Sequence, residues 1–218
     1  VFQIPPQGTI NLHASLLPQY RGPAPINWAL IQGEKETGVT IFYIEEQVDT
    51  GNIILQKKTS IGPEETAGEL HDRLAVMGAE LLVKSIDLIE QGKAPRLPQE
   101  GPVSKAPKIT REICQIDWNK DAISIFNLVR GVSPSPGAFT FFNGRLMKIH
   151  RVKVEKTFGK RRREPGQIVK IDLKRGEIQV ATGQGSISIL ELQPEGKRQM
   201  TAEEFLRGHR LQVGEQFG

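Results

Sequence analysis

The chain has 218 residues, of which 38% are hydrophobic and 25% charged, with a formal net charge of +4. This composition is ordinary for a globular protein and suffices for one large or two modest domains. No apolar run approaches the ~20 residues that span a bilayer, and no basic and then apolar leader is present, so we expect a soluble, non-secreted, cytoplasmic protein. The single cysteine, Cys114, excludes an internal disulfide and the paired spacing of a zinc site.

The charge is unevenly distributed along the chain. Residues 1–92 contain 6 Lys/Arg and 12 Asp/Glu, a net charge of −6, whereas residues 93–218 contain 23 and 13, a net charge of +10. A basic half joined to an acidic half is expected where one part performs chemistry and the other contacts a polyanion. Nucleic acid is the leading candidate for that polyanion.

The first half of the chain alternates strand and helix patterns, which predicts an α/β domain. Thr66 and Glu69 form a capping-box pattern at the start of a long helix. The first strand has few partners upstream and the chain begins with Val1. We therefore expect residues 1–92 to be the second half of a doubly wound, Rossmann-like domain whose first half is absent from this sequence. The expected elements are a strand at 9–13, a loop at 18–25, a helix at 26–32, strands at 39–44 and 53–56, and a helix at 66–92.

Residues 93–110 carry five Pro or Gly residues without a sustained period, which predicts a linker. A second domain is expected at 111–218, opening with a helix at about 122–130 and continuing with short strands. Asn143-Gly144 is a strong hairpin signal between two of them. Short strands with tight turns favour a small closed, OB-like barrel, because closure removes exposed strand edges. The expected strands are 139–142, 146–154, 167–173, 177–181 and 186–192.

Three polar residues of the first half suit acyl transfer. Asn11 and His13 alternate along a strand and therefore share a face, and Asp49 follows a buried strand, where active-site loops of open α/β sheets collect. An amide N–H and an imidazole can hold an oxyanion, while a carboxylate orients the imidazole and moves a proton. No covalent nucleophile is required, and Ser15 lacks the Gly-x-Ser-x-Gly elbow of a serine nucleophile. Taken alone, His13 fits better as a hydrogen-bonded histidine at a strand end, and Asp49 as a turn cap; the accompanying loop and the presence of both residues favour the functional interpretation.

These residues resemble the signature of the folate-dependent formyltransferases. The chain has the Asn-x-His strand at 11–13, the Ser-Leu-Leu-Pro-x-x-Arg-Gly loop at 15–22 and the downstream Asp-x-Gly at 49–51. It is most similar to the branch of that family that formylates initiator tRNA, because the resemblance continues through Ile116-Asp117-Trp118 and through 192–200, a signature of the tRNA-specific C-terminal domain. The resemblance covers essentially the whole chain, whereas the family's N-terminal segment, which forms part of the folate pocket, has no counterpart here.

The resemblance implies transfer of a formyl group from 10-formyltetrahydrofolate to the α-amino group of methionyl initiator tRNA, in translation initiation, by a monomer that needs no metal and contacts no membrane. It implies that Asn11 and His13 bind the oxyanion, that Asp49 holds His13 and relays the proton, and that a substrate and folate loop is formed by Ser15, Leu16, Leu17, Pro18, Arg21 and Gly22. The basic residues expected to contact tRNA phosphates are Arg145, Lys148, Arg151, Lys153, Lys160, Arg161, Arg162, Arg163, Lys197 and Arg198.

Several alternatives stay open on the sequence. The acceptor of the formyl group could instead be a nucleotide-linked amino sugar, or water in a hydrolase, although the basic second half argues against both. A truncated RNA-binding module without activity is a further reading. Arg21 fits either a contact to RNA phosphate or a surface arginine. Phe139, Phe141 and Phe142 could stack on bases, but their spacing before a hairpin is more typical of a barrel core.

Overall fold

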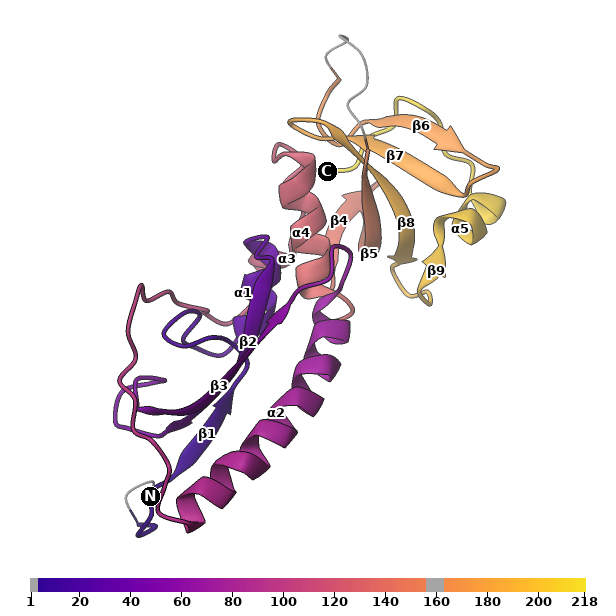
Figure 1. Ribbon diagram of the computed structural model, residues 1–218. Coiled ribbons are helices and arrows are strands. Elements are labelled where there is room, and N and C mark those ends of the chain that lie inside the picture. The colour runs from indigo at the N-terminus through magenta and orange to yellow at the C-terminus, as the bar shows by residue number, and fades with distance from the viewer. Residues whose placement is uncertain (1–3, 156–162) are drawn as a thin grey trace. The chain divides into compact units, whose positions relative to one another are not determined.

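The computed structural model describes residues 4–155 and 163–218, which form two compact units, Val1–Ile109 and Thr110–Gly218 (Figure 1). The boundary falls at the end of the segment expected to be a linker. Residues 93–109 belong to the first unit, where Leu97 pairs with Ile53. Each unit is described by itself below.

The first unit is built on a three-stranded antiparallel sheet. Strands β1 (Ile10–His13), β2 (Glu36–Tyr43) and β3 (Ile53–Ser60) lie in the order β1-β2-β3. The short helix α1 (Pro25–Ile31) connects β1 to β2 and begins with a proline, whose fixed φ suits the first turn of a helix. Both strand pairs are antiparallel, so the parallel pairs of a doubly wound sheet are not found among the described residues. The expected strands and helices are confirmed, whereas their parallel arrangement is not.

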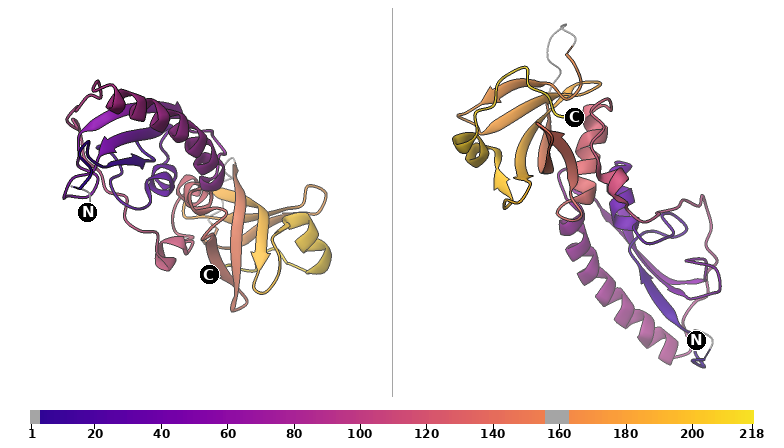
Figure 2. Two further views of the ribbon diagram at one scale, coloured as in Figure 1. Left: turned by 90° about the horizontal axis from the view of Figure 1, so that it is seen from below. Right: turned by 180° about the vertical axis from the view of Figure 1, so that it is seen from behind.

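One face of this sheet is covered by the long helix α2 (Ala67–Glu90), as the views of Figures 1 and 2 agree. The predicted capping box is present: the Thr66 hydroxyl accepts from the Glu69 N–H, and the Glu69 carboxylate accepts from the Thr66 N–H. Leu70 and Leu74 pack in the core beneath the helix. Although α2 has 24 residues, no helix in the described ranges is long and apolar enough to cross a membrane.

The second unit is β-rich, as predicted. Its strands pair in the order β4-β5-β8-β7-β6, with β9 added beside β8. Asn143 and Gly144 join β4 to β5 with positive φ values of 50° and 74°, as the hairpin signal predicts. The elements of this unit are α3 (Arg111–Cys114), α4 (Ala122–Val132), β4 (Ala138–Phe142), β5 (Arg145–Glu155), β6 (Ile168–Asp172), β7 (Glu177–Ala181), β8 (Ser186–Pro194), β9 (Met200–Thr201) and α5 (Ala202–Gly208).

The closed OB-like barrel that we expected is not found in the part of the chain that the structure describes. The outermost strands β4 and β6 do not pair with each other. The C-terminal residues lie along their edges instead, since Phe217 bridges Phe142 and Gln216 bridges Gln167. Strand counting could not predict this, because the terminal segment has no alternating apolar pattern. Phe139 is buried, in agreement with a core role.

Candidate active site

Strand β1 presents Asn11 and His13 on the sheet face opposite to α2. Leu12, between them, points to the helix, where a Cβ at Gly78 would lie 2.6 Å from its Cδ1. Asn11 pairs with Phe42 and His13 with Thr40 on the neighbouring strand. Asn11 is exposed and its side chain makes no hydrogen bond within the described residues, whereas His13 is only 6% exposed. The strand thus offers one free amide beside a buried imidazole.

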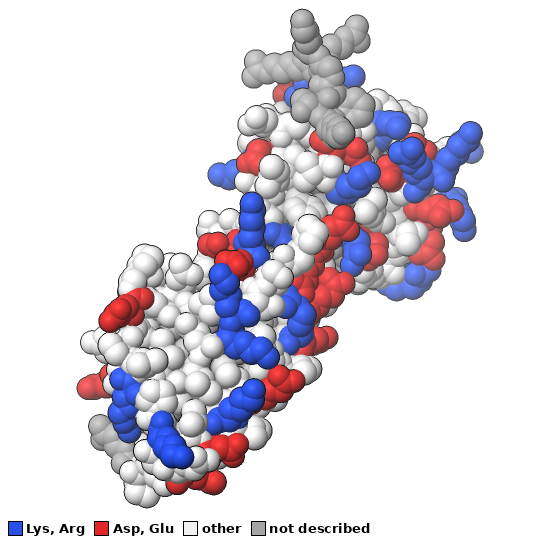
Figure 3. Space-filling model, viewed as in Figure 1, with Lys and Arg blue, Asp and Glu red and all other residues white. Residues whose placement is uncertain are grey.

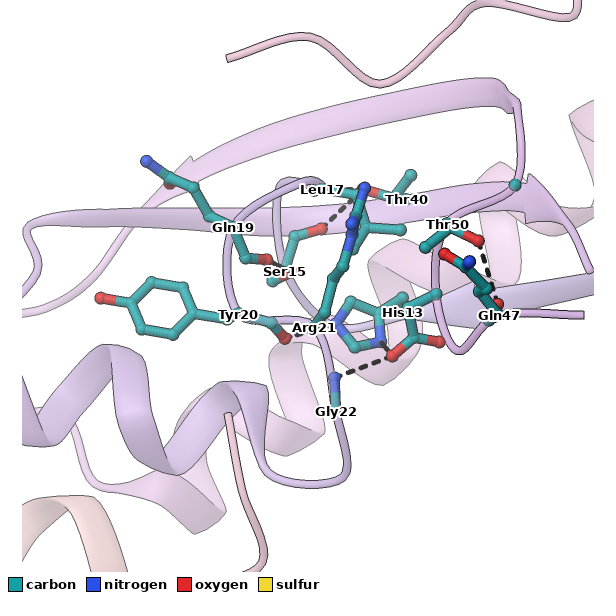
Figure 4. Close-up of polar contacts among 12 residues, drawn as sticks. His13, Ser15, Leu17, Gln19, Tyr20, Arg21, Gly22, Thr40, Gln47 and Thr50 are labelled. Carbon is teal, nitrogen blue, oxygen red and sulfur yellow. Dashed lines mark hydrogen bonds and ion pairs between the residues drawn. The ribbon is translucent and has the colours of Figure 1, made fainter. Parts of the chain in front are cut away.

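Both ring nitrogens of His13 face acceptors (Figure 4). Nε2 lies 2.8 Å from the carbonyl oxygen of Tyr20, which can only accept, so Nε2 carries a hydrogen. Nδ1 lies 3.7 Å from Oδ2 of Asp49, a distance within ion-pair range but longer than a hydrogen bond. The imidazole is therefore oriented by the loop at 15–22 on one side and by the carboxylate on the other.

Asp49 is placed by an unusual backbone conformation. Its φ of 55° is left-handed, and its side chain is 12% exposed. Oδ2 accepts a hydrogen bond from the Gly22 N–H at 2.8 Å, while Oδ1 has no hydrogen-bond partner in the described residues. Gly51 completes the motif because a Cβ there would collide with the carbonyl oxygen of Tyr43. The Asp-x-Gly pattern therefore fixes a carboxylate with one oxygen held and the other open.

The predicted loop at 15–22 is held by two residues that sequence reasoning missed. The Thr40 hydroxyl donates to the Ser15 carbonyl at 2.6 Å and accepts from the Leu17 N–H at 3.2 Å. Gln56 donates to the Leu17 carbonyl at 3.0 Å and to the Thr40 hydroxyl at 2.9 Å. Ser15 itself is buried and its hydroxyl donates to the Gln19 carbonyl at 2.6 Å, which is a structural role. Thr40 shares the face of His13 because the two residues are paired across β1 and β2, a register that strand alternation alone does not give.

The end of that loop contacts the segment expected to be a linker. The backbone of Arg21 donates to the Ser104 carbonyl at 3.0 Å and accepts from the Ala106 N–H at 2.7 Å. Gly22 has a φ of 123°, and a Cβ there would lie 2.6 Å from the Ala106 carbonyl oxygen, so only glycine fits. The Tyr20 hydroxyl donates to Glu34. The pKa of the phenol is raised, mainly by burial and secondly by its hydrogen bond to this carboxylate.

The described basic residues that are expected to contact tRNA are exposed or half-buried, and acidic residues lie among them, as Figure 3 shows for one face. Three of them form surface ion pairs: Arg151 with Glu191 at 3.9 Å, Lys153 with Glu155 at 3.4 Å and Arg198 with Glu204 at 2.8 Å. Lys148 donates to the Pro136 carbonyl. Of the residues expected to contact tRNA, those without an ion pair in the described part of the chain are Arg145, Lys148, Arg163 and Lys197, while Lys160, Arg161 and Arg162 lie outside the described residues.

Metal ligands do not gather at this site. Within residues 4–155 and 163–218, no group of three His, Cys, Asp or Glu side chains is arranged to hold a metal ion. Cys114 is buried, and burial raises the pKa of its thiol.

The fold is that of a formyltransferase. The family model described as "Formyl transferase" matches residues 1–86, and the model described as "Formyl transferase, C-terminal domain" matches residues 108–210.

Individual relatives place the chain in one family within the formyltransferases. Methionyl-tRNA formyltransferase of Pelotomaculum thermopropionicum is 48% identical over 214 residues, which cover 98% of this chain and 67% of the relative. The enzyme of the same name from Syntrophus aciditrophicus is 46% identical over 220 residues, covering 100% of this chain and 69% of the relative. The chain belongs to the methionyl-tRNA formyltransferase family, and it spans about two thirds of the length of these members.

Solved structures agree with this fold at lower identity. HypX from Aquifex aeolicus in complex with tetrahydrofolic acid superimposes with a TM-score of 0.69 and 20% identity, over 94% of this chain and 38% of that one. WlaRD, a sugar 3N-formyl transferase, superimposes with a TM-score of 0.66 and 23% identity, over 87% of this chain and 66% of that one. These two likenesses concern the fold alone.

Proposed function

We propose that this chain provides the reaction centre and the tRNA-contacting surface of an enzyme that formylates methionyl initiator tRNA in the cytoplasm. The formyl donor is 10-formyltetrahydrofolate and the acceptor is the α-amino group of the esterified methionine. The observation that carries the proposal is the meeting of Asn11, His13 and Asp49 on one face of the sheet, in a chain of this family.

The chemistry follows from the state of each side chain. The neutral α-amine attacks the formyl carbon, so that a C–N bond forms and the carbonyl electrons move to oxygen. The exposed Asn11 amide donates to this oxyanion, an interaction that costs about 10²–10³ in rate when it is removed. The open Oδ1 of Asp49 takes the proton that the amine loses. The bond from the formyl carbon to N10 then breaks, and N10 receives a proton.

His13 serves this reaction through its fixed orientation. Its Nδ1 faces Asp49 at 3.7 Å, so a proton gained by the carboxylate can pass to the imidazole once the two atoms approach to hydrogen-bond distance. A substrate that displaces the Tyr20 carbonyl from Nε2 would gain a second oxyanion donor. We infer that the Tyr20 carbonyl shifts when the substrates bind, because it occupies Nε2 of His13.

The folate donor is assigned to the same face of the sheet. The cluster of Leu17, Phe42 and Ile53 is packed on this side, next to the His13 ring, whose centroid lies 6.5 Å from that of Phe42. An apolar wall beside a few fixed polar groups is the usual composition of a small-molecule site.

The basic residues of the second unit are proposed to bind tRNA phosphates. Exposed ion pairs are worth about 0–1 kcal/mol, so the pairs of Arg151, Lys153 and Arg198 can be exchanged for phosphate contacts at little cost. Each phosphate contact releases a counterion, and the logarithm of affinity should fall with the logarithm of salt by roughly 0.7–0.9 per contact. Substituting Arg145 and Lys197 by alanine should reduce that slope, whereas Lys84→Ala on α2 should not.

Formylation assays test the proposal directly. This chain, and a version preceded by the N-terminal segment of the Pelotomaculum relative, would be given 10-formyltetrahydrofolate with charged initiator tRNA, a nucleotide-linked amino sugar, or water alone. We expect formyl-methionyl-tRNA from the extended version. Formyl transfer to the sugar or to water in preference to tRNA would overturn the acceptor. Absence of transfer to any acceptor would leave an RNA-binding module.

A further inference from the structure

The Gln99 side chain connects two parts of the reaction centre. Its Oε1 accepts hydrogen bonds from Nε and Nη2 of Arg21, at 3.1 and 2.6 Å. Its Nε2 donates to the carbonyl oxygens of Asp49 and Gly51, both at 2.9 Å. A carboxamide has two N–H donors and two acceptor lone pairs, so all four hydrogen-bonding positions are used. Sequence reasoning missed this residue because it lies in the segment expected to be a linker.

Only a carboxamide satisfies these partners. Rotating the amide by half a turn would point its NH₂ group at the guanidinium and its oxygen at two carbonyls, so the partners fix the orientation. Glutamate could accept from Arg21 but could not donate to Asp49 and Gly51. Lysine could donate to the carbonyls but would repel Arg21. Asparagine is one methylene shorter and cannot span both sets of partners.

The contacts bear on the reaction through Asp49. That residue has a left-handed φ of 55°, a conformation that costs energy in residues other than glycine and persists only where neighbouring contacts hold it. The Gly22 N–H holds its carboxylate, and Gln99 holds the main chain on either side of Thr50. On the other side of the amide, Arg21 has no carboxylate within ion-pair distance in the described residues, so its neutral partner fixes its position without cancelling its charge.

We propose that Gln99 is a positioning residue for formyl transfer, which holds the Asp49 loop and Arg21 in a fixed relation to each other. The proposal rests on the reaction assigned above to Asn11, His13 and Asp49. In metal sites, residues that orient a ligand without touching the metal typically contribute 10–100-fold to affinity or activity, and we expect an effect of the same order here. The two halves of the amide act on different residues, which makes their effects separable.

The test compares Gln99→Glu with Glu100→Gln in the intact protein. Gln99→Glu keeps the acceptor for Arg21 and removes both donors, while Glu100→Gln changes the neighbouring exposed residue, whose side chain makes no hydrogen bond in the described residues. We expect Gln99→Glu to lower kcat about 10–100-fold, to change KM for either substrate less than about threefold, and to shift the pH profile of kcat. Glu100→Gln should leave these parameters unchanged.

An Arg21→Met background separates the effect of the Gln99 donors from that of its acceptor oxygen. If Gln99 acts through its donors, the loss from Gln99→Glu persists when Arg21 is replaced by methionine. Its disappearance in that background would overturn the assignment to the Asp49 loop. A Gln99→Glu enzyme with kcat within about twofold of the parent and an unchanged pH profile would overturn the proposal as a whole.

Hydrogen exchange keeps this outcome distinct from a failure of the proposed function. The Gly22 amide is bonded to the Asp49 carboxylate, so its exchange reports on that loop without any substrate. Gln99→Glu should accelerate exchange at Gly22 about tenfold and leave amides in the middle of α2 unchanged. An active parent with unaltered Gly22 exchange in the variant would refute the role of Gln99 alone. Accelerated exchange in a protein that formylates no tRNA would refute the proposed function alone.

Discussion

The hydroxyl of Thr40 should decide whether the loop at 15–22 stays in place. Thr40 is 0% exposed, and its hydroxyl serves the Ser15 carbonyl, the Leu17 N–H and Gln56. Thr40→Val keeps the shape of the side chain and removes the hydroxyl. Gln56 keeps its hydrogen bond to the Leu17 carbonyl, so the two groups that lose a partner are the Ser15 carbonyl and the Leu17 N–H. At about 1–3 kcal/mol for each, the variant should lose about 2–4 kcal/mol of unfolding free energy after partial relaxation.

Urea unfolding of the first unit measures this loss. The chain has two tryptophans, Trp28 in the first unit and Trp118 in the second, so a Trp118→Phe background leaves Trp28 as the reporter. Thr40→Ser is the control, because it keeps the hydroxyl and removes one methyl group, at about 1 kcal/mol. A Thr40→Val chain as stable as Thr40→Ser would refute the reasoning, since the hydroxyl would then contribute no more than one methyl group.

Three further outcomes are expected. Asn11→Ala should lower kcat about 10²–10³-fold in the intact enzyme and change unfolding free energy by less than about 0.5 kcal/mol, because Asn11 is exposed; near-normal turnover would exclude it as the oxyanion donor. Gly51→Ala should cost more than about 2 kcal/mol in urea unfolding, since its Cβ meets the Tyr43 carbonyl, and Gly208→Ala, with open space around it, should cost less than about 0.5 kcal/mol. Burial holds the pKa of His150 below its ordinary 6.5 and keeps the folded imidazole neutral. The stability of the second unit should therefore fall as pH drops from about 6.5 towards 5, because only unfolded chains gain the proton there. His150→Gln should flatten this pH dependence, and an equally steep fall in that variant would assign the dependence to another group.

Local signals in the sequence predicted local structure correctly. The capping box at Thr66 and the Asn143-Gly144 hairpin are both present, because each depends on residues within a few positions of each other. Thr201 and Glu204 form a second capping box at the start of α5. That helix was missed although its signal has the same spacing as the first.

Long-range polar contacts could not be predicted from the sequence. Gln99 lies 50 positions from Asp49 and 78 from Arg21, and a glutamine in a Pro-rich stretch has no pattern that distinguishes it from a surface residue. The pattern of residues 39–44 places Thr40 in a buried strand but does not indicate the partners of its hydroxyl. The motif residues Asn11, His13 and Asp49 could be proposed because both their spacing and their chemistry pointed to them. Gln99 and Thr40, which hold the loops around these residues, have polar side chains but belong to no sequence motif of fixed spacing.

The hydrogen bond that holds Asp49 comes from the main chain of Gly22, and this affects how the site tolerates mutation. An amide N–H is present in every residue except proline, so no other side-chain substitution at position 22 can delete the donor itself. Selection at that position acts on size and backbone conformation, because a Cβ would meet the Ala106 carbonyl. At position 99, by contrast, selection acts on the hydrogen-bonding groups of the side chain. A saturation library should therefore show a limit of size at residue 22 and a requirement for glutamine at residue 99, two different tolerance profiles around one aspartate.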